Sequence, residues 1–211
     1  MTFALDSSKD FVFRPRSART LAGVLMAASL AGAVAVLATG GWRSWSAVLP
    51  LVLVGYVAWL LFWFPKVVVG DAAVTLVNPL QTLAVPWESI ILVDTKYALT
   101  LVTPSGRHTA WAAPAPGATA SLREMKRTAK AEKRDSSGTR YKSIRPGDQH
   151  SSDSGVVAAV VRQRLERMAE DGRIDVDATN SARPARSVHV LHVGVLLLLL
   201  VMTFTLPALA G

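Results

Sequence analysis

Few side chains in this sequence are of a type and spacing that could do chemistry. The chain of 211 residues has no cysteine, which excludes disulfides, thiolate nucleophiles and cysteine-ligated metals. His189 and His192 are three residues apart, a spacing that can bring two metal ligands together, but no third ligand lies near them in the sequence. Nucleophile elbows, phosphate loops and dinucleotide-binding glycine runs are missing. We therefore expect no enzyme activity, no metal site and no cofactor.

Basic charge is concentrated between Arg123 and Arg145, in a segment with nine basic residues and three acidic ones. Serine-containing stretches flank this segment and it has no apolar stripe, so we predict a loop within an insertion over residues 118–153. Beside an anionic leaflet, each basic residue near the surface adds on the order of 1 kcal/mol of attraction. The residues that could contact anionic lipid are Arg123, Lys126, Arg127, Lys130, Lys133, Arg134, Arg140, Lys142 and Arg145.

A solvated loop without a partner is the alternative interpretation of this basic segment. Nucleic acid is a poorer partner than lipid, because Tyr141 is the only aromatic residue among these charges and stacking platforms are missing. The net charge of +8 therefore does not by itself indicate a nucleic-acid-binding protein.

Composition indicates that a bilayer buries much of this chain. Apolar residues make up 51% of it and charged residues 18%, and the mean hydropathy is +0.33, more apolar than a soluble fold of this size could bury. Three uncharged stretches are each long enough to span a hydrocarbon core. The predicted transmembrane helices cover residues 21–39, 46–64 and 190–211, and the first two form a hairpin over residues 21–64.

Small residues recur four apart in the first span, as Gly23 with Ala27 and Ala28 with Gly32. Such pairs let another helix approach closely, and the second span is the expected partner, although alanine-rich spans also produce this spacing by chance. The spans contain no acidic residue, which argues against an ion or proton pathway.

Basic residues near the ends of the spans predict their orientation. Several lie in the tail over residues 1–20, Lys66 follows the second span, Arg183 and Arg186 precede the third, and none follows it. We expect a multi-pass plasma-membrane protein with the N-terminus and middle domain in the cytoplasm and the C-terminus outside. A cleaved signal peptide is the competing interpretation of the first span, but its apolar core is long and acidic residues precede it.

Between the second and third spans, short β-type runs alternate with turn residues. The helix that follows runs from Ser154, a capping residue, to Gly172, and its apolar side chains form one stripe that predicts packing against a sheet. We also expect Trp87 and Trp111 to pack inside the domain and His108 to lie at its surface. The predicted strands cover residues 66–69, 74–78, 82–86, 90–95, 97–103 and 107–112.

Short motifs around the predicted hairpin give the chain a resemblance to a known family. The motifs are residues 13–16 (FRPR), Phe64-Pro65, residues 77–80 (VNPL) and residues 85–87 (VPW). From about Phe13 to Gly117, and again over the helix from Ser154, the chain resembles the membrane-associated bacterial PH-like proteins of actinobacteria, the group named for a low-molecular-weight protein antigen. The basic insertion and the third span depart from that pattern, so a shared partner does not carry over.

The resemblance implies a pleckstrin-homology superfold, a bent antiparallel β-barrel capped by one C-terminal helix. In eukaryotic relatives of this fold, phosphoinositide binding needs clustered basic residues around the loop between the first two strands. This chain has Gly70-Asp71-Ala72 there, and an acidic residue without a basic neighbour in the loop repels an inositol phosphate. A shared fold does not by itself imply a shared function, and we do not expect this chain to bind phosphoinositides at that loop.

The expected fold class is thus a membrane protein with an α+β soluble domain. We expect a PH-like binding or scaffold module on the cytoplasmic face that docks a protein partner or an anionic lipid surface, without catalysis. The alternative is an accessory subunit of a membrane enzyme or transporter complex. The expected organisation is a basic tail (1–20), the hairpin (21–64), the PH-like domain (65–172), a linker (173–189) and the last span (190–211).

Overall fold

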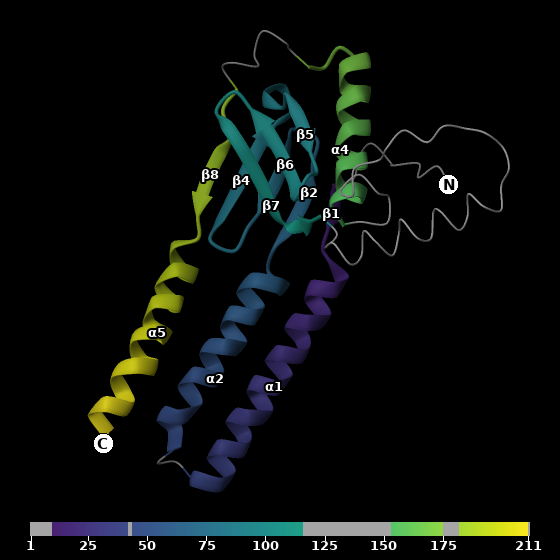
Figure 1. Ribbon diagram of the computed structural model, residues 1–211. Coiled ribbons are helices and arrows are strands. Elements are labelled where there is room, and N and C mark those ends of the chain that lie inside the picture. Colours follow the sequence, from purple (N-terminus) through teal and green to yellow (C-terminus); the bar gives the residue numbers. More distant parts are fainter. Residues whose placement is uncertain (1–9, 42–43, 116–152, 175–181, 211) are drawn as a thin grey trace, which may run out of the picture.

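Apolar helices run into one end of a β domain, and a shorter helix covers one side of that domain (Figure 1). The computed structural model describes residues 10–41, 44–115, 153–174 and 182–210. The basic residues predicted to contact lipid lie outside these described residues.

The two N-terminal helices are long and apolar enough to cross a membrane. Helix α1 covers Arg16–Gly40, with a mean hydropathy of 2.3. Helix α2, Trp45–Ala58, continues as a π-helical turn, η2 (Trp59–Trp63), and the two together have a mean hydropathy of 2.0. Helix α5 covers Val190–Ala210, but its described apolar part, Val190–Leu206, is shorter, so a third membrane span stays a prediction.

Small residues let α1 and α2 pack closely against each other. A Cβ atom added to Gly32 would lie 3.3 Å from Leu51 Cδ1, and one added to Gly55 would lie 3.4 Å from Ser29 Cβ. Gly23, in contrast, has no neighbouring atom within 4 Å of such a position. Of the two predicted small-residue pairs in the first span, the one with Gly32 therefore faces the second span.

Five antiparallel strands form the first sheet, in the order β1-β2-β3-β4-β8. The central strands β2, β3 and β4 agree with the first three predicted strands to within one residue at each end. The edge strands β1 and β8 were not predicted, because each is short and lies next to an apolar helix. The strands are β1 (Phe11–Phe13), β2 (Lys66–Val69), β3 (Ala73–Val77), β4 (Gln81–Pro86) and β8 (Ala185–Val188).

Three strands form the second sheet, in the order β5-β6-β7. The last two agree with predicted strands, whereas the predicted strand over residues 90–95 is shorter and follows a 3-10 turn, η3 (Trp87–Ser89). The strands are β5 (Leu92–Asp94), β6 (Ala98–Thr103) and β7 (Gly106–Pro114).

The prediction of a closed barrel is wrong. Strand β2 pairs with β1 on one side and β3 on the other, and β4 pairs with β3 and β8. The unpredicted strands β1 and β8 therefore cover β2 and β4, whose backbone groups would otherwise be available to pair with the second sheet. A side chain links the two sheets where no backbone ladder forms. Asn78, which follows β3, donates from Nδ2 to the carbonyl of Thr109 (3.0 Å) and accepts at Oδ1 from the backbone N–H of Trp111 (2.8 Å).

Helix α4 covers Asp153–Glu170 and ends as predicted. Gly172 has a φ of +64°, which a residue without a side chain adopts readily, and the backbone N–H of Arg173 donates to the carbonyl of Met168 (2.9 Å). The helix begins one residue earlier than predicted, so Ser154 is buried in its first turn instead of capping it.

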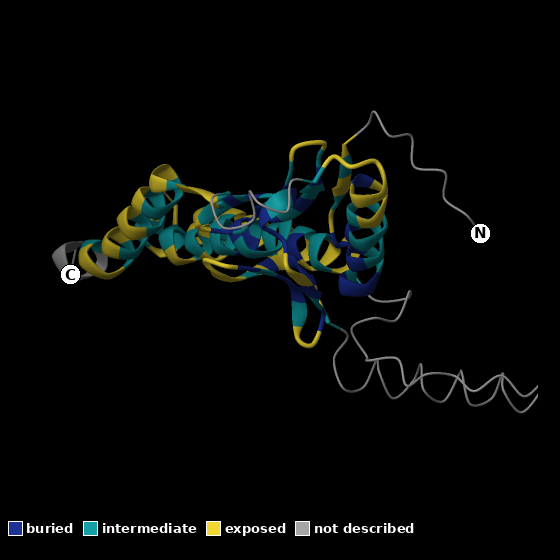
Figure 2. Ribbon diagram, turned by 90° about the horizontal axis from the view of Figure 1, so that it is seen from above, coloured by how far each residue is buried: buried dark blue, intermediate teal, exposed yellow. Residues whose placement is uncertain are grey.

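The hydrophobic core lies between the sheets and α4. Viewed from above, buried residues line the side of α4 that faces the sheets (Figure 2). Val157 and Val161 are fully buried and pack with strand residues such as Leu76 and Leu101, which confirms the predicted apolar stripe. Because this core is closed, ligands must be sought at its edges.

Candidate functional site

Three strands pass almost directly into the long helices. Two residues separate β1 from α1, two separate η2 from β2, and one separates β8 from α5. All three junctions lie at the same end of the domain (Figure 1), which we call the proximal end, and the opposite end, with the β2–β3 and β6–β7 turns, is the distal end. Such short connections leave the helices little freedom to move relative to the sheet.

A tryptophan from the second sheet fastens the end of α2 at the proximal end. Within an α-helix the carbonyl of Leu61 would accept from residue 65, but Pro65 has no N–H to donate. The chain forms the π-helical turn here, closed by the Phe64 N–H on the Trp59 carbonyl (2.9 Å). The indole Nε1–H of Trp111 then donates to the Leu61 carbonyl (2.7 Å). This hydrogen bond joins β7 to the helix hairpin.

The expectation that Trp111 packs inside the domain is wrong. Its side chain is 52% exposed, because it extends from β7 over the end of α2. Trp87 does pack inside as predicted: it is 1% exposed, and its indole N–H donates to the Gly70 carbonyl (3.1 Å). The sequence signal for the role of Trp111 is the proline four residues after Leu61, which leaves a helical carbonyl without a partner.

Both predicted histidines of the third-span junction lie in an aromatic cluster. His189 lies between β8 and α5; its Nε2 is 2.8 Å from the Thr82 hydroxyl oxygen. Nδ1 of His192 is 3.3 Å from the Tyr56 hydroxyl oxygen, and both histidine rings contact the edge or face of Phe64. In the described parts of the chain, no three side chains that could ligate a metal ion are grouped. The geometry gives these histidines the role of holding α5 against α2 and β4.

Arg19 supports the first junction. Its guanidinium carbon lies 4.3 Å from the centroid of a Trp63 ring, so the first turn of α1 is held against the end of α2 by a cation–π contact. The backbone N–H of Arg19 donates to the carbonyl of Pro15 (3.2 Å), which begins the helix.

An ion pair occupies the distal turn between β2 and β3. Asp71 has no basic neighbour in sequence, but α4 supplies one in space: Arg164 forms an ion pair with its carboxylate and also donates to the Val69 carbonyl (3.3 Å). Since this arginine is neutralised by Asp71, it adds no net positive charge to the turn. That phosphoinositide does not bind at this turn stays a prediction.

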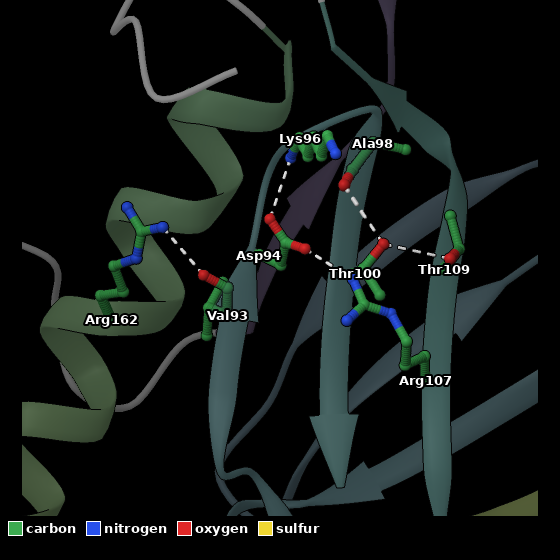
Figure 3. A network of polar contacts seen from close by, with 8 residues as sticks. All are labelled: Val93, Asp94, Lys96, Ala98, Thr100, Arg107, Thr109 and Arg162. Atoms are coloured by element: carbon green, nitrogen blue, oxygen red, sulfur yellow. Dashed lines mark hydrogen bonds and ion pairs between the residues drawn. The ribbon is translucent and has the colours of Figure 1, made fainter. Parts of the chain in front are cut away.

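Polar side chains on the second sheet are paired with one another (Figure 3). Arg107 and the backbone N–H of Lys96 both donate to the carboxylate of Asp94, at 2.6 and 3.1 Å. Burial raises the pKa of Asp94, but these hydrogen bonds outweigh it and hold the pKa below its usual value. Arg162 of α4 donates to the Val93 carbonyl (2.9 Å) and covers the edge of β5. These contacts hold β5 to β7, to the turn after β5 and to α4.

His108 lies on β7 and is partly exposed. Its Nε2 lies 3.2 Å from the Thr103 hydroxyl oxygen, and burial lowers the pKa of the imidazole.

An apolar cavity of about 360 Å³ lies at the proximal end. The start of α1, next to Pro15, and the turn η2, which contains Leu61, line one side, and the second sheet lines the other with Ala98 and Trp111. Asp153, at the start of α4, is the charged residue of the lining, and burial raises the pKa of its carboxyl. The cavity therefore lies where the hairpin, the sheet and α4 meet.

The nine basic residues from Arg123 to Arg145 lie outside the described residues, but the chain on either side of their insertion is described. Pro114 ends β7 and Asp153 begins α4, and both line the cavity. The backbone N–H of Ala115 donates to the carbonyl of Tyr97 (2.9 Å) at the same end. The insertion therefore leaves and rejoins the domain at the proximal end.

Comparison with known proteins supports a bacterial PH domain over the middle of the chain and leaves the narrower actinobacterial group a prediction. No curated protein matches the chain, and no solved structure does. Residues 64–165, just under half of the chain, match a family model. That match covers the strands from β2 to β7 and most of α4, and it begins at the end of η2. The family is the bacterial PH domain, so the middle of this chain is a PH-like domain.

Proposed function

We propose that this chain is a membrane-anchored PH-like binding module that works without catalysis. Its anchors are α1, α2 and α5, with the N-terminus and the PH-like domain in the cytoplasm and the C-terminus outside. The observation that carries the proposal is the set of three short strand-to-helix junctions, all at the proximal end. A domain that only needed tethering would require one flexible linker, whereas this one is fixed in orientation.

The proposed ligand of the module is the anionic surface of the membrane itself. Both ends of the basic insertion join the domain at the proximal end, beside the helix ends, where a headgroup layer would lie. Basic residues attracted to anionic lipid act only within about a Debye length, roughly 8 Å at physiological salt, so this placement matters. Arg123 to Arg145 would then contribute to holding the domain against the inner leaflet.

A single fluorophore in the insertion tests the lipid contact. Since the chain has no cysteine, Ser137→Cys provides one labelling site in the full-length protein. In nanodiscs containing anionic lipid, we expect quenching by headgroup-spin-labelled lipid, and we expect that quenching to weaken with added salt. The matched control carries glutamine at all nine basic positions and should be quenched little. Equal quenching of the two proteins would contradict the lipid contact.

An accessory subunit of a membrane enzyme or transporter is the second candidate, and α5 favours it. Beyond His192 the helix presents large apolar side chains, among them Leu197 and Phe204, that are exposed on the described structure. Lipid or a partner helix could cover them. Cross-linking from α5 in native membranes distinguishes the two, because a reproducible protein adduct through Phe204 would support a subunit role and labelling by lipid alone would not.

A further inference from the structure

The cavity at the proximal end is lined mostly by apolar groups, and two of its polar groups are already paired. The indole N–H of Trp111 is bonded to the Leu61 carbonyl, and the hydroxyl oxygen of Thr109 is 3.0 Å from that of Thr100. Water needs two to four polar partners to stay in such a space. Apart from Ser17 and Asp153, the rest of the lining is apolar, and it includes the half-exposed ring of Trp111.

The position of the cavity indicates what reaches it. Pro15 directly precedes α1 and Ala18 lies in its first turn, while Leu61 and Phe62 lie in η2, which continues α2. The cavity is therefore level with the ends of the two apolar helices. In a bilayer that level is the boundary between headgroups and acyl chains. Lipid around the helices at that level would therefore lie next to the cavity.

We propose that this cavity binds an acyl chain of a membrane lipid. Its volume of about 360 Å³ falls within the range usual for small-molecule sites, and each buried methylene group contributes about 0.8 kcal/mol. The inference rests on the proposed membrane anchoring, since it takes the lipid from the leaflet around α1 and α2. The acyl-chain site would be a defined lipid-binding site, in addition to the proposed contact of the basic residues from Arg123 to Arg145 with lipid headgroups.

Photolabelling of the full-length protein tests the site. The protein is placed in nanodiscs that contain a phospholipid with a diazirine on its acyl chain, illuminated, digested and analysed by mass spectrometry. We expect adducts on cavity residues such as Trp111 and Phe62, in addition to those on the outward faces of α1 and α2. Adducts on α1 and α2 but none in the cavity would overturn the site.

Two variants fill the cavity from opposite sides. Ala18→Phe adds a ring from α1 and Ala98→Phe adds one from β6, and Ala169→Phe, exposed near the end of α4, is the matched control. We expect each filling variant to lower cavity labelling about tenfold, the loss that follows from displacing roughly two methylene groups, and the control to leave it unchanged. Thermal unfolding of all three shows whether they fold.

The outcomes separate this inference from the proposed function. Cavity labelling that survives both filling variants would overturn the site while leaving the membrane anchoring standing. Absence of adducts on α1 and α2 in the unmodified protein would overturn the anchoring, and the site with it.

Discussion

The two ends of the PH-like domain are held by different kinds of contact. At the distal end the chain satisfies its own turns: the Gly70 N–H donates to the Ala73 carbonyl (3.1 Å), and Arg164 neutralises Asp71. At the proximal end the contacts run from the domain to the helices, as between Trp111 and Leu61. The distal end therefore completes a fold, whereas the proximal end positions that fold against its anchors.

The largest expected difference between the ends concerns the two tryptophans. Trp87→Ala leaves a cavity in the core beside the distal turn, and should lower the free energy of unfolding by roughly 3 to 5 kcal/mol. Trp111→Ala removes a half-exposed ring and one hydrogen bond at the proximal end, and should cost nearer 1 kcal/mol. Unfolding of both variants in detergent measures the two losses of unfolding free energy. Equal losses would contradict the distinction between a core tryptophan at the distal end and a joining tryptophan at the proximal end.

The hairpin below the proximal end should be the next most sensitive region. Gly55→Leu forces a side chain against Ser29 and should destabilise the packing of α1 on α2 by roughly 1 to 3 kcal/mol. Gly23→Leu is the matched control, since nothing lies near its Cβ position. Thermal unfolding compares the two, and distances between spin labels on α1 and α2 should lengthen in the first variant alone.

A smaller effect is expected where Asn78 links the sheets near the proximal end. Asn78→Ala removes its two hydrogen bonds and should cost about 1 to 2 kcal/mol. Hydrogen exchange should show faster exchange of the Trp111 amide, which loses its acceptor, while amides in β2 and β3 stay protected. Unchanged exchange at Trp111 would mean that a backbone ladder, not this side chain, joins the sheets.

The smallest expected effect is a pH dependence at Asp153. Burial raises the pKa of this carboxyl, so at neutral pH the folded protein pays to keep it charged and the unfolded chain does not. Asp153→Asn should therefore unfold at a slightly higher temperature than the unmodified protein at pH 7. The difference should vanish as the pH falls below the ordinary carboxyl pKa, where Asp153 is neutral in both states. If the advantage of Asp153→Asn over the unmodified protein in unfolding temperature grew as the pH fell, this explanation would be contradicted.

Much of the domain follows from patterns that are local in sequence. Alternating apolar residues identify β2, β3 and β4, and the stripe through Val157 and Val161 identifies the face of α4 that packs on the sheets. The edge strands β1 and β8 are too short for a recognisable alternation, and their pairing depends on the helices beside them. Because they occupy the edges of the first sheet, this sheet does not close with the second into the barrel that the family resemblance implies.

The candidate site could be predicted only in part. The basic charge from Arg123 to Arg145 is plain in sequence, but its placement at the proximal end depends on where β7 ends and α4 begins. The role of Trp111 needed the π-helical turn before Pro65, which brings a free carbonyl within reach of another element. The pairing of Asp71 with Arg164 joins residues far apart in the chain, and no local pattern reveals it.

Depth measurements at the two ends of the domain test the central claim most directly. Tyr97→Cys lies at the proximal end and Ser105→Cys lies in the distal turn after β6, both at exposed positions in a chain without other cysteines. With a fluorophore at each site in nanodiscs, headgroup-spin-labelled lipid should quench the label at position 97 strongly and the label at position 105 little. Equal quenching at both positions, or stronger quenching at position 105, would contradict a domain held with its proximal end against the membrane.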